Sequence, residues 1–108
     1  MAKTPEGKVK DMIRRKLIER GFMQVAQGCT DARRWFWMPV QGLYSVQGMS
    51  DYLGMCDGKP WFIEAKSEDG EPTAHQADFL AMAESSGAVT AIVRNEHDME
   101  LLLYVICD

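Results

Sequence analysis

The dipeptide Asp57-Gly58 lies between two largely apolar stretches, and it is the preferred two-residue turn of a β-hairpin. Such a turn sets the pairing register of both strands, because the residues on either side of it must face each other. Counting outward from the turn places Asp51 directly opposite Glu64. The sequence therefore predicts a hairpin over residues 51–66 that holds two carboxylates across from each other, with Cβ atoms about 5 Å apart.

Two opposed carboxylates need a partner, because like charges directly opposite each other destabilise a strand pair. A divalent cation is the natural candidate, since hard cations prefer carboxylate oxygens. Strand alternation places Lys66 on the same face as Glu64, whereas the core-facing positions are Trp61, Ile63 and Ala65. An ammonium group in this place could orient or deprotonate an attacking water, or neutralise negative charge on a phosphoryl oxygen.

The acid-x-lysine triplet is by itself a weak signal, because chance alone expects roughly one in a chain of this composition. The sequence contains three, which begin at Glu6, Asp57 and Glu64. Only the third lies on an apolar strand with an acid registered opposite. A solvated strand face with a weak surface ion pair remains an alternative for Glu64 and Lys66, and a simple turn position remains one for Asp51.

Periodicity and capping residues predict the other elements. In chain order we expect a helix over 5–20, strands over 22–27 and 35–40, a helix over 74–86 and a strand over 88–94. Thr4 and Thr73 are good N-caps, and Gln76 completes a capping box with Thr73. The tail is ambiguous, with a short helix over 96–102 and a strand over 103–107 as one interpretation. The order predicts an α/β fold, a mixed sheet with helices packed on it.

Composition limits the class of protein. The 108 residues, 46% hydrophobic and 26% charged, suit one globular domain over residues 1–108. A net charge of −4 argues against a protein that coats nucleic acid nonspecifically, but not against a nuclease. Three cysteines far apart favour neither zinc nor a disulfide framework. Without a signal peptide or a span of about 20 apolar residues, we expect a cytoplasmic protein with no membrane partner.

The hairpin belongs to a longer set of motifs: Gly48-Met49-Ser50-Asp51, then Glu64-Ala65-Lys66, then Thr73-Ala74-His75-Gln76 before a helix. This set resembles the VRR-NUC family of virus-type replication-repair nucleases, within the PD-(D/E)XK superfamily. The resemblance covers nearly the whole chain and suggests a stand-alone domain of the phage type, in a bacterial or phage-infected cell. It implies a restriction-endonuclease-like mixed β-sheet flanked by helices. One departure is Ser50, where the superfamily's name has proline.

The resemblance also implies roles for individual residues. Asp51 and Glu64 would bind Mg²⁺ or Mn²⁺, with the backbone carbonyl of Ala65 as a further ligand, and Lys66 would be the catalytic lysine. Gln76 looks like the family's helix-borne glutamine near the site, although a capping-box residue is an equal alternative. Glu6 looks like the first-helix acid that approaches the metal, although acids are favoured at any helix N-terminus.

These roles imply a metal-dependent DNA endonuclease. Similar stand-alone domains suggest a homodimer acting on branched DNA such as Holliday junctions, since a two-fold dimer suits a two-fold substrate. Alternatives are a nuclease for flaps, ends or plain duplex, a catalytically silent DNA-binding module, or a protein-interaction domain. The cluster Trp35-Phe36-Trp37 could stack on DNA beside Arg33 and Arg34, but core or interface packing is favoured.

Overall fold

A computed structural model describes residues 3–25, 32–40 and 48–107 of the chain. The eight elements, in chain order, are α1 (Pro5–Glu19), β1 (Met23–Gln24), β2 (Arg34–Trp37), β3 (Tyr52–Cys56), β4 (Lys59–Ala65), α2 (Ala74–Ser85), β5 (Val89–Val93) and α3 (Glu96–Cys107). Among the described residues, no helix combines the length and the apolar character that a membrane span requires.

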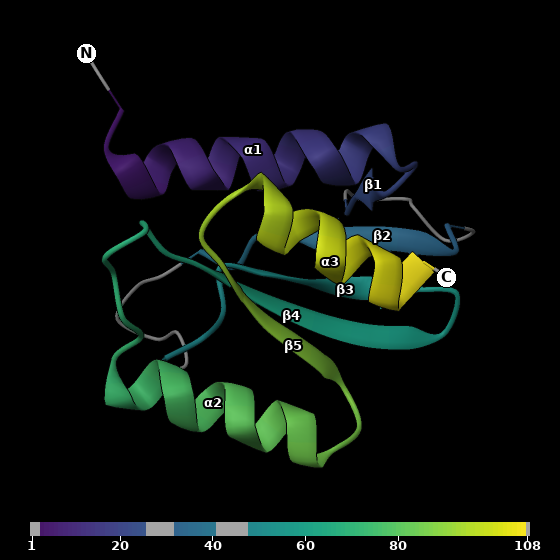
Figure 1. The fold of residues 1–108 in the computed structure, drawn as a ribbon. Coiled ribbons are helices and arrows are strands. Elements are labelled where there is room, and N and C mark those ends of the chain that lie inside the picture. The colour runs from purple at the N-terminus through teal and green to yellow at the C-terminus, as the bar shows by residue number, and fades with distance from the viewer. Residues whose placement is uncertain (1–2, 26–31, 41–47, 108) are drawn as a thin grey trace.

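The five strands form one mixed sheet in the order β1-β2-β3-β4-β5. The outer pairs, β1–β2 and β4–β5, are parallel, whereas β2–β3 and β3–β4 are antiparallel. Helices α1 and α3 lie on one side of the sheet and α2 lies on the other (Figure 1). The predicted α/β arrangement, a mixed sheet flanked by helices, is confirmed.

The hairpin of β3 and β4 has the predicted register. Cys56 pairs with Lys59 and Tyr52 pairs with Ile63, so the next position outward places Asp51 opposite Glu64. Both turn residues have positive φ, 49° at Asp57 and 89° at Gly58. A type I′ turn requires positive φ at both positions, which explains why Asp-Gly forms the turn here.

The main core lies between the sheet and the pair α1 and α3. Trp61, Ile63 and Ala65 are fully buried, as strand alternation predicted. Gly54 pairs with Trp61 across the hairpin, and a Cβ on Gly54 would come within 2.5 Å of the Trp61 ring. The indole therefore occupies the space that a side chain at position 54 would need.

Local signals locate the helix ends well. The Thr4 hydroxyl accepts the Gly7 amide and caps α1, which ends one residue before the predicted limit. Thr73 and Gln76 form the predicted capping box of α2. The strand predicted over 35–40 ends at Trp37, because Pro39 has no N–H for a ladder bond. Residues 26 and 27 of the first predicted strand lie outside the described residues, and so do Cys29 and Gly42.

Two predictions are wrong. The tail contains no strand: residues 96–107 form the single helix α3, since Met99, Leu102, Leu103 and Ile106 lie at helical spacing and are buried. The sequence also places Met82 among the apolar residues expected on the buried side of α2, with Phe79, Leu80 and Ala83, but Met82 is 59% exposed. The short sheet covers only one strip of α2, through Leu80 and Ala83, so the flank of that helix remains in solvent.

Candidate functional site

The carboxylate of Asp51 points across the hairpin onto β4. Its Oδ2 accepts the backbone N–H of Ala65 at 2.8 Å, and its Oδ1 lies 3.4 Å from the ammonium nitrogen of Lys10. The side chain is 17% exposed. One oxygen is thus held by the backbone of β4, while the other lies next to the partly exposed Lys10.

Glu64 is the one charged residue among the buried side chains of the described chain, with 2% exposure. Its Oε1 accepts a hydrogen bond from Nε2 of Gln76 at 2.9 Å. Its Oε2 is buried and accepts no hydrogen bond from the described residues. Burial, and next the negative charge of Asp51, raise the pKa of Glu64 to about 8. The ionised form of this side chain therefore lacks a strong partner at its second oxygen.

Lys66 directly follows β4 and carries its ammonium group between two acids. Its Nζ lies 3.9 Å from Oε1 of Glu64 and 3.9 Å from Oε1 of Glu6. Its backbone N–H donates to the carbonyl of Val93, so the peptide next to the site is tied to β5. With 11% of the side chain exposed, Lys66 holds its charge inside the site and not in bulk solvent.

Gln76 makes two hydrogen bonds at once, one within the capping box and one to Glu64. Its Oε1 accepts the backbone N–H of Thr73 at 2.9 Å, which completes the capping box. Its Nε2 donates to Glu64 from the other end of the same amide. The capping box therefore fixes the orientation in which the side chain approaches the buried carboxylate.

The start of α2 also contacts the segment that leads to Asp51. Gly48 has φ of +83°, and a Cβ there would lie 2.3 Å from the carbonyl oxygen of His75. The Gly48 that begins the first motif therefore permits a close approach of the two backbones. Ser50 is fully buried between Gly48 and Asp51.

Helix α1 contributes Glu6 and Lys10, one helical turn apart. Besides its contact with Lys66, Glu6 lies 3.7 Å from Lys10 through Oε2. Lys10 in turn lies between Glu6 and Asp51. The sequence interpretation included Glu6 but missed Lys10. The spacing i, i+4 from an acid is the one signal for it, and that spacing is common on helix surfaces.

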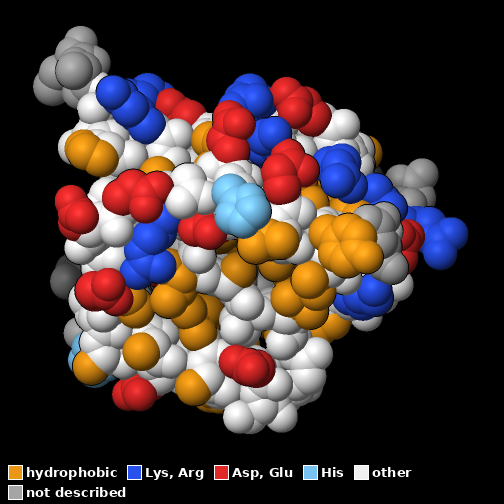
Figure 2. All heavy atoms as spheres, viewed as in Figure 1, with side chains coloured by type: hydrophobic (Ala, Val, Ile, Leu, Met, Phe, Trp, Pro, Cys, Tyr) orange, Lys and Arg blue, Asp and Glu red, His pale blue; other side chains and the backbone are white. Residues whose placement is uncertain are grey.

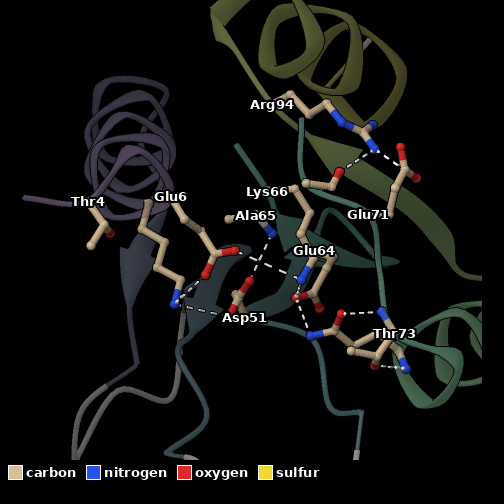
Figure 3. A network of polar contacts seen from close by, with 12 residues as sticks. Thr4, Glu6, Asp51, Glu64, Ala65, Lys66, Glu71, Thr73 and Arg94 are labelled. Atoms are coloured by element: carbon tan, nitrogen blue, oxygen red, sulfur yellow. Dashed lines mark hydrogen bonds and ion pairs between the residues drawn. The ribbon is translucent and has the colours of Figure 1, made fainter. Parts of the chain in front are cut away.

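Arg94 is a second residue that the sequence interpretation missed. Its guanidinium donates to the Gly70 carbonyl at 2.9 Å and lies 3.4 Å from a Glu71 carboxylate oxygen. These contacts tie the loop after Lys66 to the end of β5 (Figure 3). Arg94 therefore holds the chain that connects the two motif segments, Glu64–Lys66 and Thr73–Gln76.

Five of the predicted site residues thus meet directly: Asp51 with the Ala65 amide, and Glu64 with Lys66 and Gln76. Glu6 reaches them through Lys66. No group of three His, Cys, Asp or Glu side chains within the described ranges is arranged to hold a metal ion. The two opposed acids, Asp51 and Glu64, therefore need a ligand of another kind, such as a backbone carbonyl, to make a cation site.

The basic residues of the sequence that lie close together are paired within the fold: Arg14, Arg15, Lys16 and Arg20 in one cluster, and Arg33 and Arg34 in another. Arg15 lies 2.9 Å from Glu96, and Lys16 lies 2.6 Å from Glu100, so these pairs join α1 to α3. Figure 2 shows Lys or Arg and Asp or Glu side chains interleaved over this part of the surface. Arg34 lies near Asp57 and over the ring of Phe22. Among the described residues on this side of the molecule, positive and negative side chains alternate and form no broad positive face for a polyanion (Figure 2).

The aromatic cluster divides between two environments. Phe36 is fully buried in the core, whereas Trp37 is 50% exposed. Core packing therefore explains the central residue of Trp35-Phe36-Trp37, but not all three.

Comparison of the chain with protein-family models, with curated proteins and with solved structures gave no match.

Proposed function

We propose that the chain is a metal-dependent nuclease of the restriction-endonuclease-like type, which hydrolyses phosphodiester bonds of DNA. The observation that carries the proposal is the pair Asp51 and Glu64, held opposite each other by the hairpin register, with Lys66 beside Glu64. The succession of a hairpin, a helix and a further strand parallel to β4 supports the same fold type.

The acidic pair fits Mg²⁺ or Mn²⁺ by its chemistry. Both ions prefer carboxylate oxygens, and the buried Oε2 of Glu64 is an acceptor without a donor among the described residues. Asp51 and Glu64 would hold the ion together with the Ala65 carbonyl. Glu6, the further ligand expected from the sequence, contacts Lys66 and Lys10 in this structure and would have to leave them to reach the ion. When bound, the ion would acidify a water and neutralise charge on a phosphoryl oxygen.

The chain's own residues supply the remaining functions. Lys66 keeps a positive charge beside the acidic pair, where it can orient an attacking water or neutralise charge that develops on the phosphate. Gln76 holds the Glu64 carboxylate in one orientation through the capping box. Such positioning matters because misplacement of a reacting group by about 1 Å can cost on the order of a hundredfold in rate.

The preferred substrate in this proposal is branched DNA such as a four-way junction, cut by a homodimer. This finer part rests on the family resemblance of the motifs. A two-fold dimer would present two sites to the two strands of a two-fold junction. The net charge of −4 and the internally paired arginines favour contacts concentrated at the site over a broad electrostatic surface.

The test is cleavage of a labelled four-way junction and of linear duplex DNA, with Mg²⁺, with Mn²⁺ or with EDTA. Wild type is compared with Lys66→Ala and with a control, Lys59→Ala, which changes an exposed lysine at the other end of β4. We expect metal-dependent cutting that Lys66→Ala abolishes and Lys59→Ala retains. Preference for the junction supports the branched substrate, and equal cutting of both DNAs supports the plain nuclease.

A second candidate is a catalytically silent DNA-binding module of the same fold. The absence of a three-acid metal cluster among the described residues favours it. Folded wild-type protein that binds DNA but cuts neither substrate with either metal would overturn the nuclease proposal in favour of this module.

A further inference from the structure

The ammonium group of Lys10 lies against the one oxygen of Asp51 that the backbone leaves available. Oδ2 of Asp51 accepts the Ala65 amide at 2.8 Å, whereas Oδ1 lies 3.4 Å from Nζ of Lys10. Lys10 also lies 3.7 Å from Oε2 of Glu6. A divalent cation that bound Asp51 through Oδ1 would have to take the place next to Lys10.

We propose that Lys10 is a tethered cation that competes with the divalent metal for Asp51, and that it contacts a nucleic-acid phosphate once the metal displaces it. This inference rests on the proposed function. In the metal-free protein, Lys10 lies between Glu6 and Asp51, and Lys66 lies between Glu6 and Glu64. On binding of a divalent ion, two ammonium groups and the ion share one small site, and repulsion drives the less confined ammonium outward.

Exposure decides which lysine moves. Lys66 is 11% exposed and lies between two acids, whereas Lys10 is 41% exposed on the surface of α1. A lysine side chain has a flexible four-carbon stem, so Lys10 can swing into solvent without a change in the backbone. A phosphate approaching the bound metal would meet this ammonium at the rim of the site.

Charge balance supports the phosphate as the new partner. With the metal bound, the three ionised carboxylates, the two ammonium groups and the divalent ion sum to one positive charge. One phosphodiester restores neutrality. The arginines that join α1 to α3 are already paired with acids, as Arg15 is with Glu96. Metal binding therefore leaves Lys10 as the cation at the site that can contact a phosphate.

The first experiment measures binding of Mn²⁺ alone, without DNA, by calorimetry or by electron paramagnetic resonance. The variants are Lys10→Met and Lys10→Gln, with Lys8→Met as a control on an exposed position of the same helix. Removing the competing ammonium should tighten Mn²⁺ binding about threefold to fivefold, the upper part of the range of an exposed ion pair, and the control should match wild type. Unchanged or weaker binding in both Lys10 variants would overturn the inference.

The second experiment measures affinity for a duplex with uncleavable phosphorothioate linkages at saturating Mn²⁺. Lys10→Met should weaken this affinity several-fold, and the slope of log affinity against log salt concentration should fall by the amount of about one phosphate contact. Lys8→Met should change neither. Equal affinity and equal salt dependence would overturn the phosphate contact. If wild type binds Mn²⁺ and the Lys10 substitutions have no effect, this inference alone is refuted. If wild type does not bind Mn²⁺, the proposed function is refuted together with it.

Discussion

Glu64 should make the metal-free protein less stable as the pH rises, and Glu64→Gln should remove that dependence. The pKa of this carboxyl rises in the folded state from 4.5 to about 8, because burial and the charge of Asp51 disfavour the ionised form. The folded protein therefore binds more protons than the unfolded chain between these two values. Stability is greatest below the unfolded pKa and is lost as the pH rises through the folded pKa.

The size of the effect follows from the shift. One pKa unit corresponds to about 1.4 kcal/mol, so a shift from 4.5 to about 8 corresponds to at most about 5 kcal/mol. Between about pH 5 and about pH 8, the free energy of unfolding should fall by roughly 3 kcal/mol from this residue. Glutamine keeps the shape and remains neutral throughout, so the variant should gain on wild type by that amount.

The assay is urea unfolding in EDTA, followed by the fluorescence of buried Trp61, at several pH values. Glu84→Gln, on an exposed position of α2, is the matched control and should follow wild type at every pH. We expect the stability difference between Glu64→Gln and wild type to grow steadily with pH. A difference that is the same near both ends of the range would refute the burial of an ionisable Glu64.

Three further results should follow from the same geometry. Mn²⁺ affinity should rise about tenfold per pH unit up to about pH 8 and then level off, because the ion must displace the proton of Glu64. Calorimetry in buffers of different ionisation enthalpy would detect the released proton, and no proton release would contradict the raised pKa of Glu64. Gly48→Ala should lower the free energy of unfolding by about 2 kcal/mol or more, because the new Cβ would lie 2.3 Å from the His75 carbonyl oxygen and the residue has positive φ. Thermal unfolding measures this loss, and Gly21→Ala is the control, since Gly21 also has positive φ but a Cβ there would contact nothing. Gln76→Ala should lower the free energy of unfolding in urea by about 1–2 kcal/mol, because it removes the hydrogen bond to the Thr73 amide and the hydrogen bond to Glu64. Unchanged stability would mean that neither hydrogen bond stabilises the fold.

Residues close in sequence determined the hairpin without help from the rest of the fold. Asp57-Gly58 favours one turn type, and that turn sets which residues pair along both strands. The opposition of Asp51 and Glu64 could therefore be predicted, and the capping box of α2 likewise depends on residues three positions apart. Such features depend on local backbone geometry, which the order of residues specifies.

The tail and the far side of α2 could not be predicted in this way. A short apolar run suits a strand and a buried helix equally, and only the packing of α3 against α1 and β5 selects the helix over 103–107. The exposure of Met82 could not be predicted either. Its apolar side chain suits a buried helix face, but the sheet does not extend far enough to cover it.

The sequence by itself determined the acidic pair, the lysine beside it and the helix caps. Only the tertiary structure decided what surrounds the pair: α1 brings Glu6 and Lys10 to β4, and α2 brings Gln76 onto Glu64. The burial that raises the pKa of Glu64 also arises there. The physical reason is that solvent exclusion and long-range ion pairs depend on which surfaces pack together, and that packing is a property of the whole chain.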